Sequence, residues 1–193
     1  MTTTASWVAT RGPSKLTRRR YAGHGAVSSL GSVPRLLIVH HSPTPSVAAL
    51  TEAVVAGASD EAITGVEVVV RPALTAAADD VLAADGYLLG TPANFGYMSG
   101  ALKHFFDSIF LQAGGALTDD GSAATVEGGR KPFGLYVHGR YDTTGAVRSV
   151  QSIVGALGWR QSAPVLEVLG DVGNAERESA YELGGTLAAL VMG

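Results

Sequence analysis

Hydrophobic residues change from irregular to regular spacing at about Arg35, and two kinds of segment alternate from there onward. Short, mostly apolar runs rich in β-branched residues predict strands. Between them, apolar residues recur every three or four positions, which predicts amphipathic helices. The predicted strands are 36–40, 66–71, 86–91, 133–138 and 165–169. Because these runs are apolar on both faces, we expect a parallel sheet with helices on both sides.

The helical spacing is clearest in three stripes. Gly158 is expected to end the third helix, and Asn174 to cap the last one, with Glu176 and Glu178 in its first turn. Asp79 and Asp80 are expected to begin a short crossover helix. The stripes are Val47, Leu50 and Val54; Leu102, Phe105, Phe106, Ile109 and Phe110; and Val147, Val150, Val154 and Leu157.

The expected fold is an α/β, flavodoxin-like doubly wound sheet of five parallel strands in the order 2-1-3-4-5. Right-handed crossovers between parallel strands favour this order for five strands. Ligands of such sheets bind at the carboxyl ends of the strands, where the order reverses. The loops after the first, third and fourth predicted strands are therefore the candidate site.

Residues 1–34 lack apolar periodicity and carry an arginine cluster at Arg18, Arg19 and Arg20. We predict a disordered basic tail before a single domain spanning residues 35–193, although a basic arm for nucleic acid or lipid is the alternative. Segment 112–129 is polar and rich in glycine, which predicts a mobile surface connection; a lid or dimer-facing loop is the alternative.

Composition narrows the class of protein. The chain has 193 residues, 46% of them hydrophobic and 16% charged, and a net charge of -3, so nucleic acid is not an expected partner. It has no cysteine, which excludes disulfides, thiolate metal sites and cysteine nucleophiles. No apolar run reaches the roughly 20 residues of a membrane-spanning helix, and no secretory signal is evident. We therefore expect a cytoplasmic protein that does not bind membranes.

The loop after the first strand reads "HHSPTPS" and places three hydroxyls, those of Ser42, Thr44 and Ser46, just before a helix. Free N–H groups at a helix N-terminus attract anions, so this loop is a candidate phosphate site. It lacks the dinucleotide and nucleoside-triphosphate glycine motifs. The alternative is structural: Ser46 caps the helix while Pro43 and Pro45 stiffen its entry.

The loop after the third strand reads "TPANFGYMSG". Pro92 is expected to end the strand and Ser99 to cap the next helix. Backbone groups from Ala93 to Gly96 and the Asn94 side chain are suited to the edge of a heterocycle, and Phe95 or Tyr97 to its face. A simple turn with two aromatic side chains packed in the core remains open.

Together these segments resemble flavodoxin-like FMN-binding proteins, in particular the NADPH-dependent FMN reductase and WrbA-type quinone reductase group. The resemblance covers about residues 35–191, and its most specific part is "GTPANFGYMSGALKHFFD". It implies that Pro92, Ala93, Asn94, Phe95 and Gly96 lie at the isoalloxazine. It also implies a phosphate loop of Ser42, Thr44, Ser46 and Val47, and a third loop of His138, Gly139, Arg140, Tyr141 and Asp142.

The resemblance implies hydride transfer from NADPH or NADH through FMN to a quinone, flavin or similar small acceptor, in a homodimer or homotetramer. No catalytic side chain and no metal ligands are expected, because the cofactor carries the chemistry. His138 is placed either near the reduced ring's negative charge or in a structural hydrogen bond.

One departure concerns the phosphate loop, in which Pro45 replaces a glycine and Val47 a hydroxyl residue of the pattern [ST]-x-T-G-x-T. Proline removes an N–H donor, so weaker FMN binding is expected. Two other functions remain open: a one-electron flavodoxin-type carrier, and a flavin-free scaffold that binds a protein. The small net charge argues against the carrier, because shuttle flavodoxins are usually strongly acidic.

Overall fold

The computed structural model describes residues 33–113 and 131–193. Most of the predicted tail, and residues 114–129 of the predicted surface connection after the second stripe, lie outside these residues; Gln112 and Ala113 belong to the end of that stripe's helix. Of the tail, only Val33 and Pro34 are described, and the first strand begins directly after them at Arg35.

Five strands form the main sheet, and all their pairings are parallel. β2 lies beside β1, β1 beside β3, and β3 beside β5, while β7 pairs with the carboxyl half of β5. The predicted order 2-1-3-4-5 is therefore confirmed, with β5 and β7 as the fourth and fifth predicted strands. These strands are β1 (Arg35–His40), β2 (Glu67–Pro72), β3 (Gly86–Asn94), β5 (Pro132–Gly139) and β7 (Leu166–Leu169).

Two short strands were not predicted. β6 (Arg160–Gln161) pairs in parallel with the start of β5, so two segments share the outer edge of that strand. β4 (Tyr97–Met98) folds back antiparallel on the end of β3, opposite Ala93 and Asn94. The second of these strands changes the candidate site, as described below.

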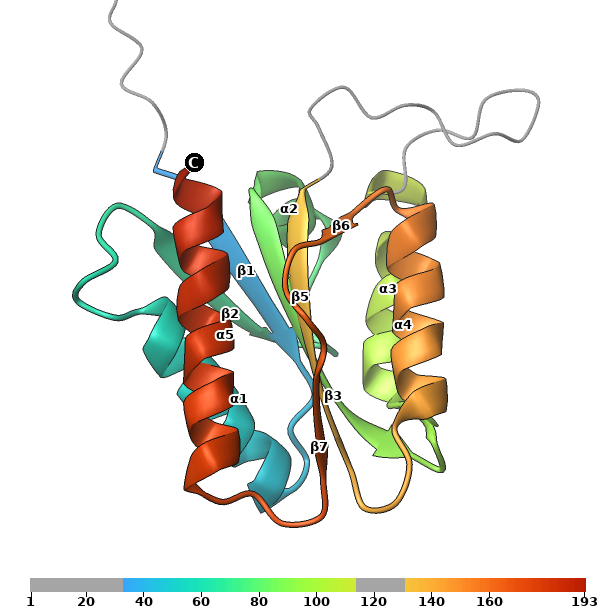
Figure 1. Ribbon diagram of the computed structural model, residues 1–193. Coiled ribbons are helices and arrows are strands. Elements are labelled where there is room, and N and C mark those ends of the chain that lie inside the picture. The colour runs from blue at the N-terminus through green and yellow to red at the C-terminus, as the bar shows by residue number, and fades with distance from the viewer. Residues whose placement is uncertain (1–32, 114–130) are drawn as a thin grey trace, which may run out of the picture. The chain divides into compact units, whose positions relative to one another are not determined.

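Helices cover both faces of the sheet, as predicted (Figure 1). On one face, α1 and α5 pack on Leu36, Ile38 and Tyr136; on the other, α2, α3 and α4 pack on Leu37, Val39 and Leu135. The alternation follows from the strand period of two. The helices are α1 (Pro45–Ala58), α2 (Ala78–Ala83), α3 (Gly100–Ala113), α4 (Thr144–Ala156) and α5 (Asn174–Met192).

The predicted helix ends were partly right. Gly158 follows the end of α4 with φ of 73°, a left-handed value that favours glycine. Asp79 and Asp80 lie in the first turn of α2, as expected. The prediction for Asn174 was wrong: it is the first residue of α5, and Gly173 precedes the helix and donates its N–H to Glu176 at 2.8 Å.

The three predicted stripes face the sheet, with one exception. Phe110, which we placed in the second stripe, is 45% exposed, whereas Phe106 and Ile109 beside it are buried. A helix buries only the part of its surface that meets the sheet, so the outer margin of a wide stripe remains in solvent. In residues 33–113 and 131–193, no helix has both the length and the apolar character needed to cross a membrane.

Candidate functional site

The loop after β1 leads directly into α1, whose N-cap is Thr44. The Thr44 Oγ1 accepts a hydrogen bond from the Val47 N–H at 3.4 Å, and Pro45 occupies the first helical position. The alternative in which Ser46 caps the helix was therefore wrong: Ser46 lies within the first turn. Proline suits the first position because the N–H it lacks has no partner inside the helix.

Ser42 is joined to the core by a chain of hydrogen bonds. Its Oγ lies 2.9 Å from His40 Nδ1 and 2.7 Å from Thr51 Oγ1. Thr51 Oγ1 donates to the Val47 carbonyl at 3.0 Å and lies 2.8 Å from the Tyr136 hydroxyl. The loop after β1 is thus connected through α1 to the middle of β5.

This chain depends on a glycine in the central strand. Tyr136 is fully buried, and a Cβ at Gly90 of β3 would overlap its phenol ring. Burial raises the pKa of Tyr136, so its hydroxyl stays protonated and is available to donate to Thr51. The absence of a side chain at Gly90 therefore leaves room for the Tyr136 phenol, whose hydroxyl reaches Thr51 of α1.

His40 is the last residue of β1, and His41 is the first residue of the loop that follows. Burial and the positive charge of His41 lower the pKa of His40. The His41 N–H donates to the Gly90 carbonyl at 2.9 Å, and its buried Nδ1 has no hydrogen-bond partner among the described residues. The His40 ring contacts Ser42 just before α1, although our sequence analysis gave neither histidine a role.

The loop after β3 is a tight hairpin. β3 continues through Pro92 to Asn94, and β4 returns from Tyr97, leaving Phe95 and Gly96 as the two turn residues. Their φ values are 52° and 74°, both left-handed, as a two-residue hairpin turn of this kind requires. The prediction that Pro92 ends the strand was therefore wrong.

The hairpin exposes its aromatic side chains. Phe95 is fully exposed and Tyr97 is 48% exposed, so the alternative in which both pack in the core was wrong. Ser99 caps α3 as predicted, with its Oγ accepting the Leu102 N–H at 3.2 Å. The Ser99 N–H donates to Thr91 Oγ1 at 3.0 Å, which fixes both ends of the turn to the sheet.

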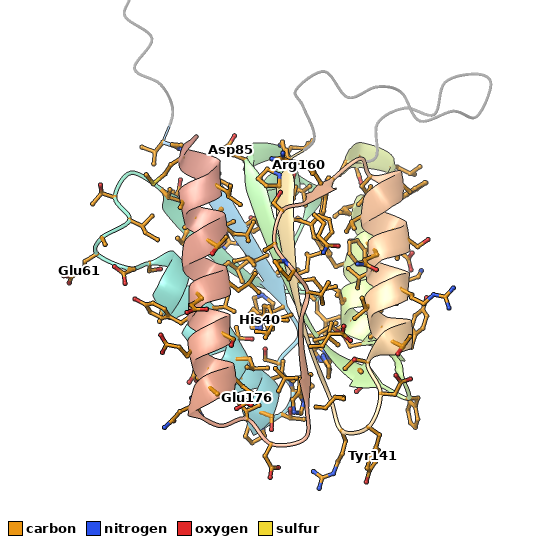
Figure 2. The ribbon with its side chains drawn as sticks, in the orientation of Figure 1. His40, Glu61, Asp85, Tyr141, Arg160 and Glu176 are labelled. Atoms are coloured by element: carbon orange, nitrogen blue, oxygen red, sulfur yellow. The ribbon has the colours of Figure 1, made fainter. Side chains whose placement is uncertain are left out.

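The loop after β5 carries the third set of predicted residues. His138 Nε2 lies 2.8 Å from the Gly170 carbonyl, and because a carbonyl only accepts, Nε2 must donate. The Asp142 carboxylate accepts the Thr144 N–H at 3.0 Å, and this hydrogen bond lowers the pKa of Asp142. Arg140 and Tyr141 are exposed, and Figure 2 shows Tyr141 at the tip of this loop, pointing away from the sheet.

The loops after β3 and β5 lie against each other. A Cβ at Gly139 would lie 3.3 Å from the Ala93 Cβ, and one at Gly96 would lie 3.4 Å from Asp142 Oδ2. A Cβ at Gly145, near the start of α4, would overlap the Gly96 carbonyl oxygen. The hairpin and the loop after β5, which leads into α4 and is called the α4 loop below, therefore lie side by side, and the loop after β1 follows the strand next to β3.

Sequence reasoning missed Thr51, Tyr136, Gly90 and Gly145. Thr51 was detectable as a polar residue one turn after Val47 on the buried side of α1, and Tyr136 as a hydroxyl within an apolar strand. Gly90 and Gly145 gave no such signal, because their requirement arises from contacts with residues far away in the sequence.

Two other features lie apart from these loops. A cavity of about 440 Å³ is lined by residues from α2, the turn before it, and the outer half of α3, including Leu74, His104 and Gln112. Within the described residues, no group of three or more His, Asp or Glu side chains could hold a metal ion.

The residues at this edge fit a flavin mononucleotide. Thr44 and Ser46 place hydroxyls, and Ser46 and Val47 place N–H groups, at the first turn of α1, where an anion is stabilised. The hairpin at Phe95 offers backbone N–H and C=O groups of its turn, and an exposed aromatic side chain, to a flat ring. Pro45 reduces the number of amide donors in this loop.

Comparisons with solved structures agree with the fold. A flavodoxin from the domain Archaea superposes with a TM-score of 0.67 and 17% identity, covering 82% of this chain and 99% of that one. A flavodoxin, WrbA-like protein from Agrobacterium tumefaciens gives a TM-score of 0.63 and 17% identity, covering 82% and 98%. At these identities the likeness concerns the fold alone.

Sequence comparison gives a curated relative and a family. A flavodoxin from Aquifex aeolicus (strain VF5) is 33% identical over 75 residues, which are 39% of this chain and 40% of that protein. The match thus spans less than half the length of the relative.

Residues 44–162 match the model of the family described as NADPH-dependent FMN reductase. These findings support FMN binding and a role as a flavin-binding oxidoreductase or flavodoxin-like protein. Because the match covers more than half of the chain and includes the first turn of α1, the hairpin and the α4 loop, the chain belongs to the NADPH-dependent FMN reductase family.

Proposed function

We propose that the protein is an FMN-dependent NAD(P)H oxidoreductase that passes hydride from NADPH or NADH to a quinone or a similar small acceptor. The observation that carries the proposal is the meeting of the hairpin after β3 with the loop after β5, beside the hydroxyl-rich start of α1. Such an arrangement at the reversal of strand order is where doubly wound sheets bind nucleotides.

The phosphate end is assigned to the loop after β1. The hydroxyls of Ser42, Thr44 and Ser46 and the amide of Val47 are the proposed phosphate contacts. In this assignment the Val47 N–H is shared between Thr44 Oγ1 and the phosphate, so the helix cap and the ligand lie side by side. An anion at this position is favoured by the helix dipole as well as by the hydroxyls.

The ring end is assigned to the other two loops. Backbone groups from Pro92 to Gly96 and the Asn94 side chain are proposed to hydrogen-bond the ring edge, with Phe95 against its face. Gly139, Arg140, Tyr141 and Asp142 would lie on the opposite side of the ring, and Arg140 supplies positive charge there. His138 serves this loop by holding the Gly170 carbonyl.

Bound FMN supplies the chemistry, namely acceptance and release of a hydride. The chain's residues are then required to bind, orient and partly cover the ring, and none is required as a nucleophile. Phe95, Tyr97 and Tyr141 are exposed at this edge, which favours a site open enough for a nicotinamide and a flat acceptor to bind in turn. By resemblance to WrbA-type reductases, a cytoplasmic homodimer or homotetramer is part of the proposal.

A one-electron carrier is the second candidate, and the partial match to the Aquifex aeolicus flavodoxin favours it. The net charge of -3 weighs against it, because a strongly acidic surface is what steers a shuttle protein onto a basic partner. The flavin-free scaffold is supported by Pro45 alone.

Spectra and steady-state assays test the proposal. The purified protein incubated with FMN is expected to retain a flavin absorption band after gel filtration. It is also expected to oxidise NADPH or NADH faster with a quinone or free flavin than with a redox protein as acceptor. Reduction of the redox protein alone would support the carrier, and absence of FMN binding would support the scaffold.

A further inference from the structure

A dianionic phosphate at the loop after β1 would meet little positive charge. Residues 41–51 contain no Lys or Arg, and the first turn of α1 has no charged side chain. Pro45 also lacks the N–H that a glycine would offer there. The ionisable side chains nearest to this loop along the chain are His40 and His41.

His40 is placed to act on this loop through Ser42. It is the last residue of β1, and its register partners, Pro72 on β2 and Gly90 on β3, carry no charge. By the alternation of β1 its side chain points to the face covered by α1 and α5, and Figure 2 shows it between the sheet and these helices. Its Nδ1 lies 2.9 Å from Ser42 Oγ.

A count of protons along the chain of hydrogen bonds shows what Ser42 needs. Thr51 has one hydroxyl proton and gives it to the Val47 carbonyl, so Tyr136 donates to Thr51 and, in one arrangement, Ser42 does so too. Alternatively, Ser42 donates to a neutral His40 whose Nδ1 is unprotonated. In either arrangement the single Ser42 proton is already donated within the protein. A phosphate dianion can only accept hydrogen bonds, so Ser42 has no proton left to offer it.

Protonation of His40 changes this balance. In the imidazolium form Nδ1 always donates, so Ser42 accepts from His40 and can turn its own proton away from Thr51 toward an anion. The same proton places a positive charge one side chain away from the helix N-terminus. Both effects favour a phosphate at this position over an uncharged group.

We infer that His40 is a positioning residue for the ligand phosphate, acting through Ser42, and that its imidazolium form binds a phosphate-bearing flavin more tightly than its neutral form does. This inference rests on the proposed FMN site and adds a pH-dependent recognition of the phosphate to it.

The surrounding ionisable groups set the direction of the effect. Burial and the charge of His41 lower the pKa of His40 in the free protein, whereas a bound phosphate dianion would raise it. Binding therefore takes up a proton, and affinity for the phosphate increases as the pH falls through the pKa of His40 in the complex toward its lower pKa in the free protein. Tyr136 and, by the alternation of β5, His138 lie on the same face of the sheet as His40, and His41 is its neighbour in the chain. Glu52 of α1 is exposed, and the carboxylate of Glu176 on α5 accepts the Gly173 N–H.

The test compares the wild type with His40→Gln, which keeps hydrogen-bonding groups but cannot carry the charge. FMN and riboflavin are titrated into both proteins, with flavin fluorescence as the readout, between about pH 5 and about pH 8. The phosphate of FMN loses its second proton near pH 6, so the ratio of the two proteins' Kd values is used to cancel this ligand titration.

We expect His40→Gln to weaken FMN binding about tenfold at the acidic end, which corresponds to a His40 pKa about one unit higher in the complex. The ratio should approach one at the alkaline end, and the riboflavin ratio should stay near one throughout. A ratio for FMN that does not change with pH, or an equal change for riboflavin, would overturn the role of His40 while leaving the flavin site intact. Failure of both flavins to bind wild-type protein would instead overturn the proposed function, and the inference with it.

An independent measurement covers the case in which His40→Gln does not fold. The His40 ring is followed by NMR during pH titration of the wild-type protein with FMN, with riboflavin and without ligand. We expect FMN, but not riboflavin, to raise the pKa of His40. An unchanged pKa in the FMN complex would contradict the inference.

Discussion

The loop after β1 and the loop after β3 are built in opposite ways. After β1, the Ser42 hydroxyl is held by His40 and Thr51, and Thr44 caps α1, so polar side chains are bonded within the protein. After β3, the turn is fixed through Thr91 and Ser99, while Phe95 projects fully into solvent. The first loop is connected to the core by side chains, and the second presents its side chains outward from a fixed backbone.

This difference has a consequence for ligand binding. Changes beneath the first loop should alter recognition of a phosphate without affecting a ring, because they act through Ser42 and α1. Changes at the tip of the second loop should affect every ligand that shares the ring.

Replacing Gly90 with Ala should have the largest effect. The new Cβ would overlap the phenol of Tyr136, which is fully buried, so β3 and β5 must shift or Tyr136 must leave its place beside Thr51. Overpacking of this kind typically costs 1–3 kcal/mol, and we expect about 3 kcal/mol here because the overlap involves a rigid ring. Urea unfolding measures the loss.

Gly155→Ala is the control for this substitution. Gly155 lies on the exposed side of α4, and a Cβ there would meet nothing within 4 Å. Alanine in a helix is about 1 kcal/mol more favourable than glycine, so a small gain in stability is expected. Equal stability of Gly90→Ala and wild type would show that the packing of Tyr136 on Gly90 does not constrain the sheet.

Replacing Tyr136 with Phe should weaken the support of the loop after β1 without changing the hairpin after β3. The hydroxyl that donates to Thr51 is lost, which should cost about 1 kcal/mol of stability and loosen the anchor of Ser42. FMN binding should weaken and riboflavin binding should not. Tyr87→Phe removes a hydroxyl that donates to the Val81 carbonyl on the other face, and should lower stability comparably without changing the preference for FMN.

Replacing Phe95 should act on the ring alone. Phe95→Ala and Phe95→Gly both remove the proposed aromatic contact, worth about 1 kcal/mol, so FMN and riboflavin should each bind about fivefold more weakly. Because Phe95 has φ of 52°, the glycine variant should be the more stable by about 1 kcal/mol. Fluorescence titrations and thermal melts measure the two effects; loss of FMN binding alone would contradict the assignment of this loop to the ring.

Removal of residues before Val33 should have the smallest effect. The first strand begins at Arg35, and both loops lie entirely after it. Thermal melting and FMN titration of a chain that begins at Val33 should match those of the full chain. A large loss in both measurements would show that the predicted tail contributes to the domain.

The sequence was sufficient for the strands and the helix faces because these depend on apolar positions such as Leu36, Ile38 and Val54. It was sufficient for the strand order because right-handed crossovers between parallel strands restrict that order. The sequence was insufficient where the exact start of a helix or an unusual backbone conformation had to be predicted. Proline at position 45 moved the helix start ahead of Ser46, and the left-handed φ of Phe95 contradicts the preference of a bulky residue. Contacts between distant residues, such as Thr51 with Tyr136, leave no local pattern to detect.

In the proposed site, the loop after β1 holds a phosphate and the hairpin after β3 holds a ring. The most direct test is titration of FMN and riboflavin into the double variant Ser42→Ala, Ser46→Ala, after a melting control for any loss of stability. At about pH 5, where protonated His40 leaves the Ser42 proton available to the phosphate, the loss of two hydrogen bonds to a charged group, at about 1.5–3 kcal/mol each, should weaken FMN binding by at least about two orders of magnitude. Riboflavin binding should be nearly unchanged. Equal weakening of both ligands, or FMN binding as tight as in wild type, would contradict the assignment.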